Sequence, residues 1–322
     1  MSRLLLTRLL EAVPVLLISA AAAFALGQVA GDPLAALGLD ASAAQRAAAA
    51  ARLGLDAPLP EQYLRFLWAA LHGDFGFSIR LARPVGALLL ERLPATVELA
   101  GAAFLVALAA GIPAGMLAAL HPRGLAARAV MAVSLLGVSL PTFLTGTLLI
   151  LLFAATLRWL PSFGRGEVVA LGGWSTGLLT GSGRLALILP ALTLGAFQAA
   201  LLLRLVADGM RGALASGHVR FARARGLPPR LIRRHALRHA LVPVLAAFGM
   251  QLGLLVAFSI VTEQVFQWPG IGLLLVQSIA AADVPVMTAY LVLTSVLFVA
   301  LSLLADLLAL AVDPRLRQGR GG

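Results

Sequence analysis

The sequence predicts an all-α protein that crosses the membrane six times. Apolar residues make up 60% of the 322 positions and the mean hydropathy is +0.95, well above the values of soluble domains. Six stretches approach or exceed the roughly 20 apolar residues that are needed to cross a hydrocarbon core. Because backbone polar groups in lipid must be satisfied within the segment, we expect each stretch to be a helix.

The predicted spans are residues 9–29, 94–120, 129–157, 185–206, 241–262 and 286–312. The first follows Arg3 and Arg8 and so has the flanks of a signal peptide. It is nevertheless long enough to cross the membrane, and no small-residue cleavage site with a soluble domain follows it. We therefore expect it to be retained as the first helix.

Residues 31–92 form the only sizeable segment that the pattern places outside the membrane. An alanine-rich stretch at 41–53 predicts a helix, residues 55–60 break it, and residues 61–71 predict an amphipathic helix. The aromatic residues of that second helix favour a position at the membrane interface, or a cap on the helix bundle, over a ligand site. Two glycines at 73 and 76 predict a turn with unusual dihedral angles.

Residues 218–243 carry seven arginines and no acid between two apolar spans, so this stretch cannot lie in hydrocarbon. Ser216 is placed to cap a helix, Gly226 to end it, and Pro228 or Pro229 to begin the next. The stretch therefore predicts a helix, a sharp turn and a second helix on one face of the membrane.

Arginine placement predicts the orientation of the chain. With the N-terminus in the cytoplasm, well over half of the basic residues fall on the cytoplasmic side, and the arginines on the other side are roughly balanced by acids. Both termini are then cytoplasmic, in agreement with an even number of spans. The same pattern favours orientation by positive charge over nucleic-acid binding as the reason for a pI near 11.7.

Composition excludes several kinds of chemistry. The chain has no cysteine, which excludes disulfides, thiolate metal sites and cysteine nucleophiles. All 25 basic residues are arginine, so the lysine of an ATP-binding P-loop is missing. His235 and His239 have the i, i+4 spacing of a metal pair, but no glutamate follows His235 and the surrounding arginines would repel a cation.

Four of the polar residues within the predicted spans are candidates for a role beyond packing, because polar groups at membrane depth are often functional. We expect the two acids to bond neighbouring helices or to anchor a loop, with contact to substrate as the alternative, and the two amides are neutral candidates: Glu98, Asp306, Gln198 and Gln251. Glycine pairs at 111/115 and 249/253 have the small-xxx-small spacing of closely packed helices. Prolines at 113, 141 and 190 are positions where spans can kink.

An ordered set of motifs along nearly the whole chain resembles one family of membrane proteins, the permeases of bacterial ABC importers of the dipeptide, oligopeptide and nickel class. The motifs are Gly73-Asp74-Phe75-Gly76, Glu91-Arg92-Leu93-Pro94-Ala95-Thr96-Val97-Glu98-Leu99, Ser139-Leu140-Pro141-Thr142-Phe143, Trp159-Leu160-Pro161, Arg223-Ala224-Arg225-Gly226-Leu227, the histidine-rich run at 234–243, Glu263-Gln264-Val265-Phe266-Gln267-Trp268-Pro269-Gly270 and Asp313-Pro314-Arg315-Leu316-Arg317. The long segment after the first span is similar to that of the B-type subunit. Gly217-His218 differ from the Asp-Tyr that the family usually carries there.

This resemblance implies the fold of a type I ABC importer permease and makes the basic stretch the loop that couples to the ATPase. The residues implied in coupling are Val219, Arg220, Ala222, Arg223, Arg225, Gly226 and Leu227. Val219, Ala222 and Gly226 fall on one helical face, which we expect to dock into the ATPase. The alternative is that the arginines only fix topology and bind anionic lipid headgroups.

The resemblance also implies an outward-facing segment that contacts the binding protein or forms an outer gate: Glu263, Phe266, Trp268, Pro269 and Gly270. It implies residence in the bacterial inner membrane. The implied partners are a second homologous permease, two cytoplasmic ATPases and a periplasmic solute-binding protein. No cofactor, metal or catalytic residue is expected in this chain, since ATP and Mg²⁺ would bind to the ATPases.

The expected organisation is a tail and first span at 1–30, a periplasmic segment at 31–92, a five-helix core at 93–317 and a tail at 318–322, with the coupling loop at 207–240. The expected function is import of peptides or a related small solute. Two other functions stay open at this point. A secondary carrier requires ionisable groups at mid-membrane and inverted repeats, neither of which is clear in this sequence. An intramembrane hydrolase requires a nucleophile and a base at membrane depth, whereas the histidines all lie in loops.

Overall fold

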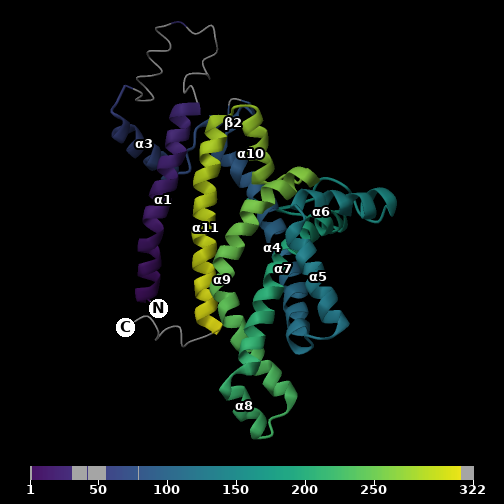
Figure 1. Ribbon diagram of the computed structural model, residues 1–322. Helices are drawn as coiled ribbons and strands as arrows, with labels where there is room; N and C mark the ends of the chain where they lie inside the picture. Colours follow the sequence, from purple (N-terminus) through teal and green to yellow (C-terminus); the bar gives the residue numbers. More distant parts are fainter. Residues whose placement is uncertain (1, 31–41, 43–55, 79, 313–322) are drawn as a thin grey trace. The chain divides into compact units, whose positions relative to one another are not determined.

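The protein is mostly helical, which confirms the predicted all-α class (Figure 1). The computed structural model describes residues 2–30, 42, 56–78 and 80–312, so the helix predicted at 41–53 lies outside the described residues. The helices are α1 (Ser2–Ala30), α3 (Leu59–Leu71), α4 (Val85–Leu120), α5 (Leu125–Ser139), α6 (Thr142–Leu149), α7 (Gly181–Ala215), α8 (Gly217–Ala224), α9 (Pro229–Phe266), α10 (Ile271–Ala280), α11 (Val284–Val312) and the π-helix η2 (Ile150–Thr156). Two antiparallel hairpins pair β1 (Phe77–Ser78) with β2 (Arg83–Pro84) and β3 (Val169–Leu171) with β4 (Trp174–Thr176).

Four helices in the described part of the chain are long and apolar enough to cross a membrane, namely those of residues 7–29, 85–120, 181–215 and 284–307. The count reaches six when α5 is joined to the α6–η2 segment and when residues 251–266 of α9 are joined to α10. The six predicted spans therefore all correspond to apolar helical segments.

The span predicted at 129–157 is not a single straight helix. α5 ends at Ser139, the chain turns by 110° at Leu140 and Pro141, and α6 and η2 follow. Proline lacks the amide hydrogen of a helix and disfavours a helical conformation in the residue before it, which explains the break. The prediction of one continuous span was wrong, whereas Pro141 is at a bend, as its sequence position suggested.

The β3–β4 hairpin corrects a second prediction. Residues 157–180 lie between η2 and α7 and belong to neither, so 31–92 is not the only sizeable segment outside the spans. The predicted spans at 129–157 and 185–206 left these residues outside the membrane, but their length was not recognised as a second extramembrane segment. The two strands register Ala170 opposite Ser175 and Leu171 opposite Trp174.

The described chain divides into two compact units. One comprises residues up to Pro94 together with Gly270–Val299, and the other comprises Ala95–Pro269 together with residues from Ala300 onwards. In the first unit, the Tyr63 hydroxyl of α3 donates a hydrogen bond to the Leu17 carbonyl of α1 at 2.8 Å, and the rings of Tyr63 and Phe66 pack on Phe24. These aromatic residues therefore hold α3 on α1.

The glycine turn in the first unit has the unusual dihedral angles expected from the sequence. Gly73 and Gly76 have φ values of +73° and +79°, a region that residues with a Cβ rarely adopt. A Cβ on Gly86 would lie 2.6 Å from the Gly73 carbonyl oxygen, so the turn packs directly on the start of α4. Just beyond the turn, the buried Ser78 hydroxyl donates to the carboxylate of Asp283, which is also buried.

Helix α7 is the central element of the second unit. It packs against α9 along much of its length, and also against α5 and α6. Gly111 and Gly115 allow α4 to approach α7, because a Cβ on Gly115 would lie 2.7 Å from both the Leu203 carbonyl oxygen and the Val206 Cβ. The small-xxx-small pair at 111/115 therefore packs helices closely, as predicted.

Candidate functional site

The predicted coupling loop is a compact helical structure at the end of two long helices. The eight-residue helix α8 connects α7, of 35 residues, to α9, of 38 residues (Figure 1). α9 runs without a break from Pro229 to Phe266, so the second helix of the loop is continuous with the span predicted at 241–262. A displacement of α8 would therefore act directly on two helices of the second unit.

A Schellman motif ends α8. The amide of Gly226 donates to the Arg223 carbonyl at 2.9 Å and that of Leu227 donates to the Ala222 carbonyl at 3.2 Å. Gly226 has a φ of +75°, which glycine adopts without the strain that a Cβ imposes. α9 then begins at Pro229. The predicted helix, glycine stop and proline start are all confirmed.

Ser216 occupies the N-cap position of α8, but its side chain does not cap the helix. The hydroxyl donates to the Ala213 carbonyl at the end of α7 and lies 3.2 Å from His218 Nε2. The prediction of a side-chain cap was wrong, because the hydroxyl turns back to the Ala213 carbonyl, which also accepts a hydrogen bond from the Ser216 amide at 3.1 Å.

The exposed residues of α8, which are the ones that could contact a partner protein, differ from the face that the sequence predicted. Val219 is only 2% exposed and packs inside the chain, so the predicted docking face of Val219, Ala222 and Gly226 is not open at its first position. Phe221 is 64% exposed, and the Arg225 guanidinium lies 5.5 Å from the centre of its ring. Arg220, Arg223, Arg225 and Gly226 are exposed, whereas Ala222 and Leu227 are half-buried.

Two histidines connect α8 to α9. The ring of His218 stacks on the ring of His239, with centroids 4.9 Å apart and planes inclined by 28°. Sequence spacing had suggested His235 as the neighbour of His239, and the contact to His218 could not be anticipated because it depends on the fold of the α8–α9 turn.

A buried polar cluster lies at the other end of the helices of the second unit. Glu98 of α4 pairs with Arg165, which donates to Oε2 through Nη2 at 2.7 Å and through Nε at 3.2 Å. Arg165 also donates to the carbonyl and the hydroxyl of Ser175 in the β3–β4 hairpin. Both charged side chains are about 95% buried. Glu98 thus anchors a loop, as expected from the sequence.

Sequence reasoning missed Arg165. It was assigned to the balanced charge outside the membrane, although a buried acid in a span calls for a cation or a donor nearby. Glycines flank it at 164 and 166, both with positive φ, and they let the chain fold back on the start of α7. The signal in the sequence was that Glu98 has no basic residue within its own predicted span, so its partner had to come from another segment.

The segment predicted to contact the binding protein is buried instead. Glu263 is fully buried and accepts a hydrogen bond from the Thr96 hydroxyl of α4 at 2.7 Å. Trp268 is 1% exposed and donates from Nε1 to the Ala95 carbonyl at 2.8 Å. Phe266 and Gly270 are buried too, and Pro269 is half-buried. These residues fasten the end of α9 to the second span. Contact of this segment with a binding protein, or a role as an outer gate, stays a prediction.

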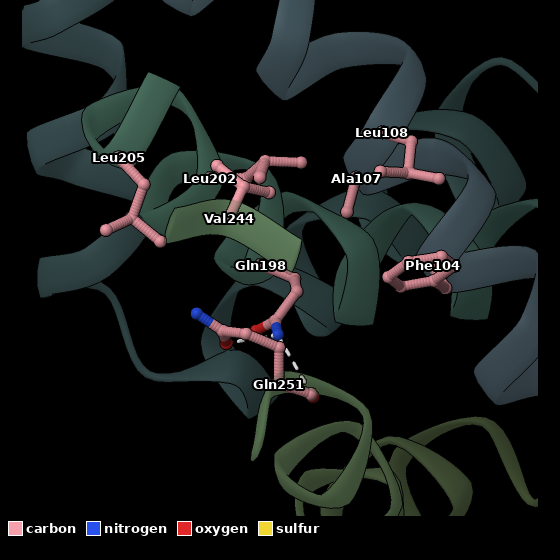
Figure 2. Close-up of a pocket in the computed structure, with 8 residues that line it drawn as sticks. All are labelled: Phe104, Ala107, Leu108, Gln198, Leu202, Leu205, Val244 and Gln251. Carbon is pink, nitrogen blue, oxygen red and sulfur yellow. Dashed lines mark hydrogen bonds between the residues drawn. The ribbon is translucent and has the colours of Figure 1, made fainter. Parts of the chain in front are cut away.

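Gln198 of α7 and Gln251 of α9 point toward one another (Figure 2). Gln198 donates to the side-chain oxygen of Gln251 and to its carbonyl oxygen, the latter at 3.1 Å. The adjoining cavity is lined mainly by apolar side chains and measures about 20 Å³, which is room for one or two waters and too little for a solute. The two amides therefore bond helix to helix. Asp306 is half-buried in α11, and its role stays a prediction.

Solved structures of the MetNI methionine ABC transporter in inward-facing conformations resemble the fold of this chain. One has a TM-score of 0.56 and covers 70% of this chain and 96% of its own, and another has a TM-score of 0.53 and covers 68% and 93%. Both are 21% identical to this chain, so they show the fold.

Curated relatives match at higher identity. A di/tripeptide transport system permease protein, DppB, of Pseudomonas aeruginosa (strain UCBPP-PA14) is 39% identical over 84% of each chain. A putative peptide transport system permease protein of Brucella abortus (strain 2308) is 37% identical over 98% of this chain and 99% of its own. The dipeptide transport system permease protein DppB of Escherichia coli (strain K12) is 36% identical over 83% and 84%.

Two family models match the sequence. One describes the N-terminal part of binding-protein-dependent transport system membrane components and covers residues 1–100. The other describes the binding-protein-dependent transport system inner membrane component and covers residues 111–318. With these matches, the permease relatives and the packed helical bundle, the chain belongs to the family of inner membrane components of binding-protein-dependent transport systems.

Proposed function

We propose that this chain forms part of the translocation pathway of an ATP-driven importer for peptides or related small solutes. The substrate class rests on the curated relatives, which are named as dipeptide, di/tripeptide or peptide permeases. The importer would contain a second homologous permease, two cytoplasmic ATPases that bind ATP and Mg²⁺, and a periplasmic solute-binding protein. This chain would hydrolyse no ATP itself.

The observation that carries the mechanism is the placement of α8 between two unbroken helices. α8 presents Phe221 and three arginines to its surroundings, and the Schellman motif at Gly226 fixes the turn that follows it. Closure of the ATPases would move α8, and α7 and α9 would carry the displacement through the membrane. Alternating access requires that the two states of the transporter differ in contacts at α8.

Burial of Val219 shifts the proposed docking surface from the face that sequence spacing suggested. Phe221, Arg220, Arg223 and Arg225 would contact the ATPase, while Val219 holds α8 on the bundle. In this arrangement α8 and both termini lie in the cytoplasm, and the inner membrane surrounds the apolar helices.

Substitution of Gly226 tests this proposal. Gly226→Val places a β-branched residue at a φ of +75°, where no neighbouring atom lies within 4 Å of the added Cβ, so the change alters the turn without a clash. We expect the assembled transporter to lose most of its peptide-stimulated ATP hydrolysis, measured after reconstitution with its partner subunits. Gly226→Asn should retain more activity because asparagine tolerates this conformation.

Gly212→Ala is the matched control, since Gly212 lies in the last turns of α7, outside α8 and the turn that follows it, has no atom within 4 Å of an added Cβ and has an ordinary φ. Its stimulated hydrolysis should equal that of the wild type. Wild-type stimulation and ATPase association in Gly226→Val would contradict the coupling role of α8.

A further inference from the structure

A second cavity lies beside the coupling loop and is much larger than the one at the glutamines. It measures about 510 Å³, within the range of roughly 300–1,000 Å³ that is usual for ligand sites. The end of α4, the end of α7, the α8–α9 turn and the first turns of α9 line this open cavity. Its lining residues are Ala119, Leu120, Leu214, Arg223, Leu227, Pro229, Ile232 and Arg233.

Two guanidinium groups provide the charge of this cavity. Arg223 and Arg233 come from opposite sides of the α8–α9 turn, and neither forms an ion pair with any of the described residues. The sequence contains no acid between Asp208 and Glu263, so nothing along α8 or the first half of α9 neutralises them. Two such groups facing one cavity favour an anion, and the planar fork of arginine matches the oxygens of a phosphate.

The rest of the lining is apolar, which distinguishes the cavity from a site for a small aqueous anion. Leu120, Leu214 and Ile232 contribute to the apolar wall. A ligand that matches both the two guanidinium groups and the apolar wall has an anionic headgroup and a hydrocarbon part.

The cavity lies at the ends of two helices that are long and apolar enough to cross a membrane. Leu120 is the last residue of α4, a candidate span, and His121, Pro122 and Arg123 follow it. Leu214 lies in the last turn of α7, a second candidate span. Where apolar helices end in arginine-rich turns, lipid headgroups meet the protein, and basic pockets at such places bind anionic headgroups.

We propose that this cavity binds an anionic phospholipid, with the headgroup phosphate between Arg223 and Arg233 and an acyl chain along Leu120, Leu214 and Ile232. Arg223 belongs both to this cavity and to the exposed surface of α8. A bound lipid would therefore stiffen the α8–α9 turn and tie coupling to the anionic lipid content of the membrane. The lipid site itself does not depend on which solute is transported.

The test measures lipid binding to the purified, assembled transporter by native mass spectrometry. Phosphatidylglycerol is compared with phosphatidylcholine of the same acyl chains, and inorganic phosphate and glycerol 3-phosphate are added as competitors. We expect the wild type to prefer phosphatidylglycerol and neither competitor to displace it. Arg223→Gln/Arg233→Gln should bind phosphatidylglycerol roughly thirty-fold more weakly, since each arginine near an anionic surface contributes about one kcal/mol.

Arg230→Gln/Arg234→Gln is the matched control, because both arginines are exposed near the start of α9 and neither lines the cavity. It should bind phosphatidylglycerol as tightly as the wild type. Arg223→Lys/Arg233→Lys should recover part of the affinity, which separates loss of charge from loss of folding. Equal binding of the two lipids, an equal loss in the control pair, or displacement by inorganic phosphate would each overturn the proposal.

Discussion

The ion pair between Glu98 and Arg165 shows how single residues set local stability in this protein. The two side chains are about 95% buried, and the pair joins α4 to the β3–β4 hairpin through Ser175. Oε2 of Glu98 accepts both guanidinium bonds, while Oε1 has no hydrogen-bond partner among the described residues. A pair with one unsatisfied oxygen already carries a desolvation cost, so removal of its cation leaves a costly buried charge.

Removal of either partner should therefore destabilise the second unit strongly. We expect Arg165→Ala to lower the free energy of unfolding by about 3–5 kcal/mol, because the Glu98 carboxylate is left buried without a cation. The double change Glu98→Leu/Arg165→Met should cost far less, since it removes both charges and keeps apolar volume. Denaturant titration in detergent provides the measurement.

The exposed pair Arg65–Glu61 is the control for this prediction. Its side chains are 54% and 51% exposed, and Arg65→Ala should change stability by less than about 0.5 kcal/mol. A cost of similar size for Arg65→Ala and Arg165→Ala would show that burial of the Glu98 pair contributes nothing.

At the scale of elements, close approach of α4 and α7 depends on residues without side chains. A Cβ on Gly111 would lie 2.9 Å from the Ala199 carbonyl oxygen, and one on Gly115 would lie 2.7 Å from the Leu203 carbonyl oxygen. Gly195 fits α7 against α4 in the same way, because its Cβ would lie 2.7 Å from the Ala103 carbonyl oxygen. Backbone atoms cannot give way as a flexible side chain can, so the helices themselves must separate.

Gly115→Ala should thus destabilise the helix pair by about 1–3 kcal/mol, in the range of overpacked cores. The midpoint of thermal unfolding of the purified chain measures this effect. Gly101→Ala is the control on the same helix, because no atom lies within 4 Å of an added Cβ there. Its midpoint should equal or exceed that of the wild type, since alanine is the better helix former. Unchanged midpoints for both variants would show that α4 and α7 pack less closely than the structure indicates.

At the scale of the whole molecule, the distribution of arginine predicts which side of the membrane each loop occupies. The coupling mechanism requires that α8 lies on the same side as the ATPases. α7 is a candidate span with the β3–β4 hairpin before it and α8 after it, so the hairpin and α8 must lie on opposite faces of the membrane. The positive-inside rule predicts, from the arginine-rich stretch around α8, that this helix lies in the cytoplasm.

The absence of cysteine makes the orientation directly measurable. Gly173→Cys in the hairpin and Ala224→Cys in α8 are both exposed positions. A membrane-impermeant maleimide should label Gly173→Cys in spheroplasts of intact inner membrane, and should label Ala224→Cys only after permeabilisation. Labelling of Ala224→Cys from outside would reverse the orientation and remove α8 from the side on which ATP is available.

The sequence by itself determined the apolar spans, the family and the turn at Gly226, because hydrophobic length, ordered motifs and glycine conformation are local properties. Only the tertiary structure decided what the spans do with their polar groups. Glu98 pairs with Arg165, which lies 67 positions away in the sequence. Glu263 and Trp268 form hydrogen bonds with α4. In α8, Val219 is buried and Phe221 is exposed. Such outcomes depend on which helices meet and which face they turn to each other, and a one-dimensional pattern of hydrophobicity carries no information about either.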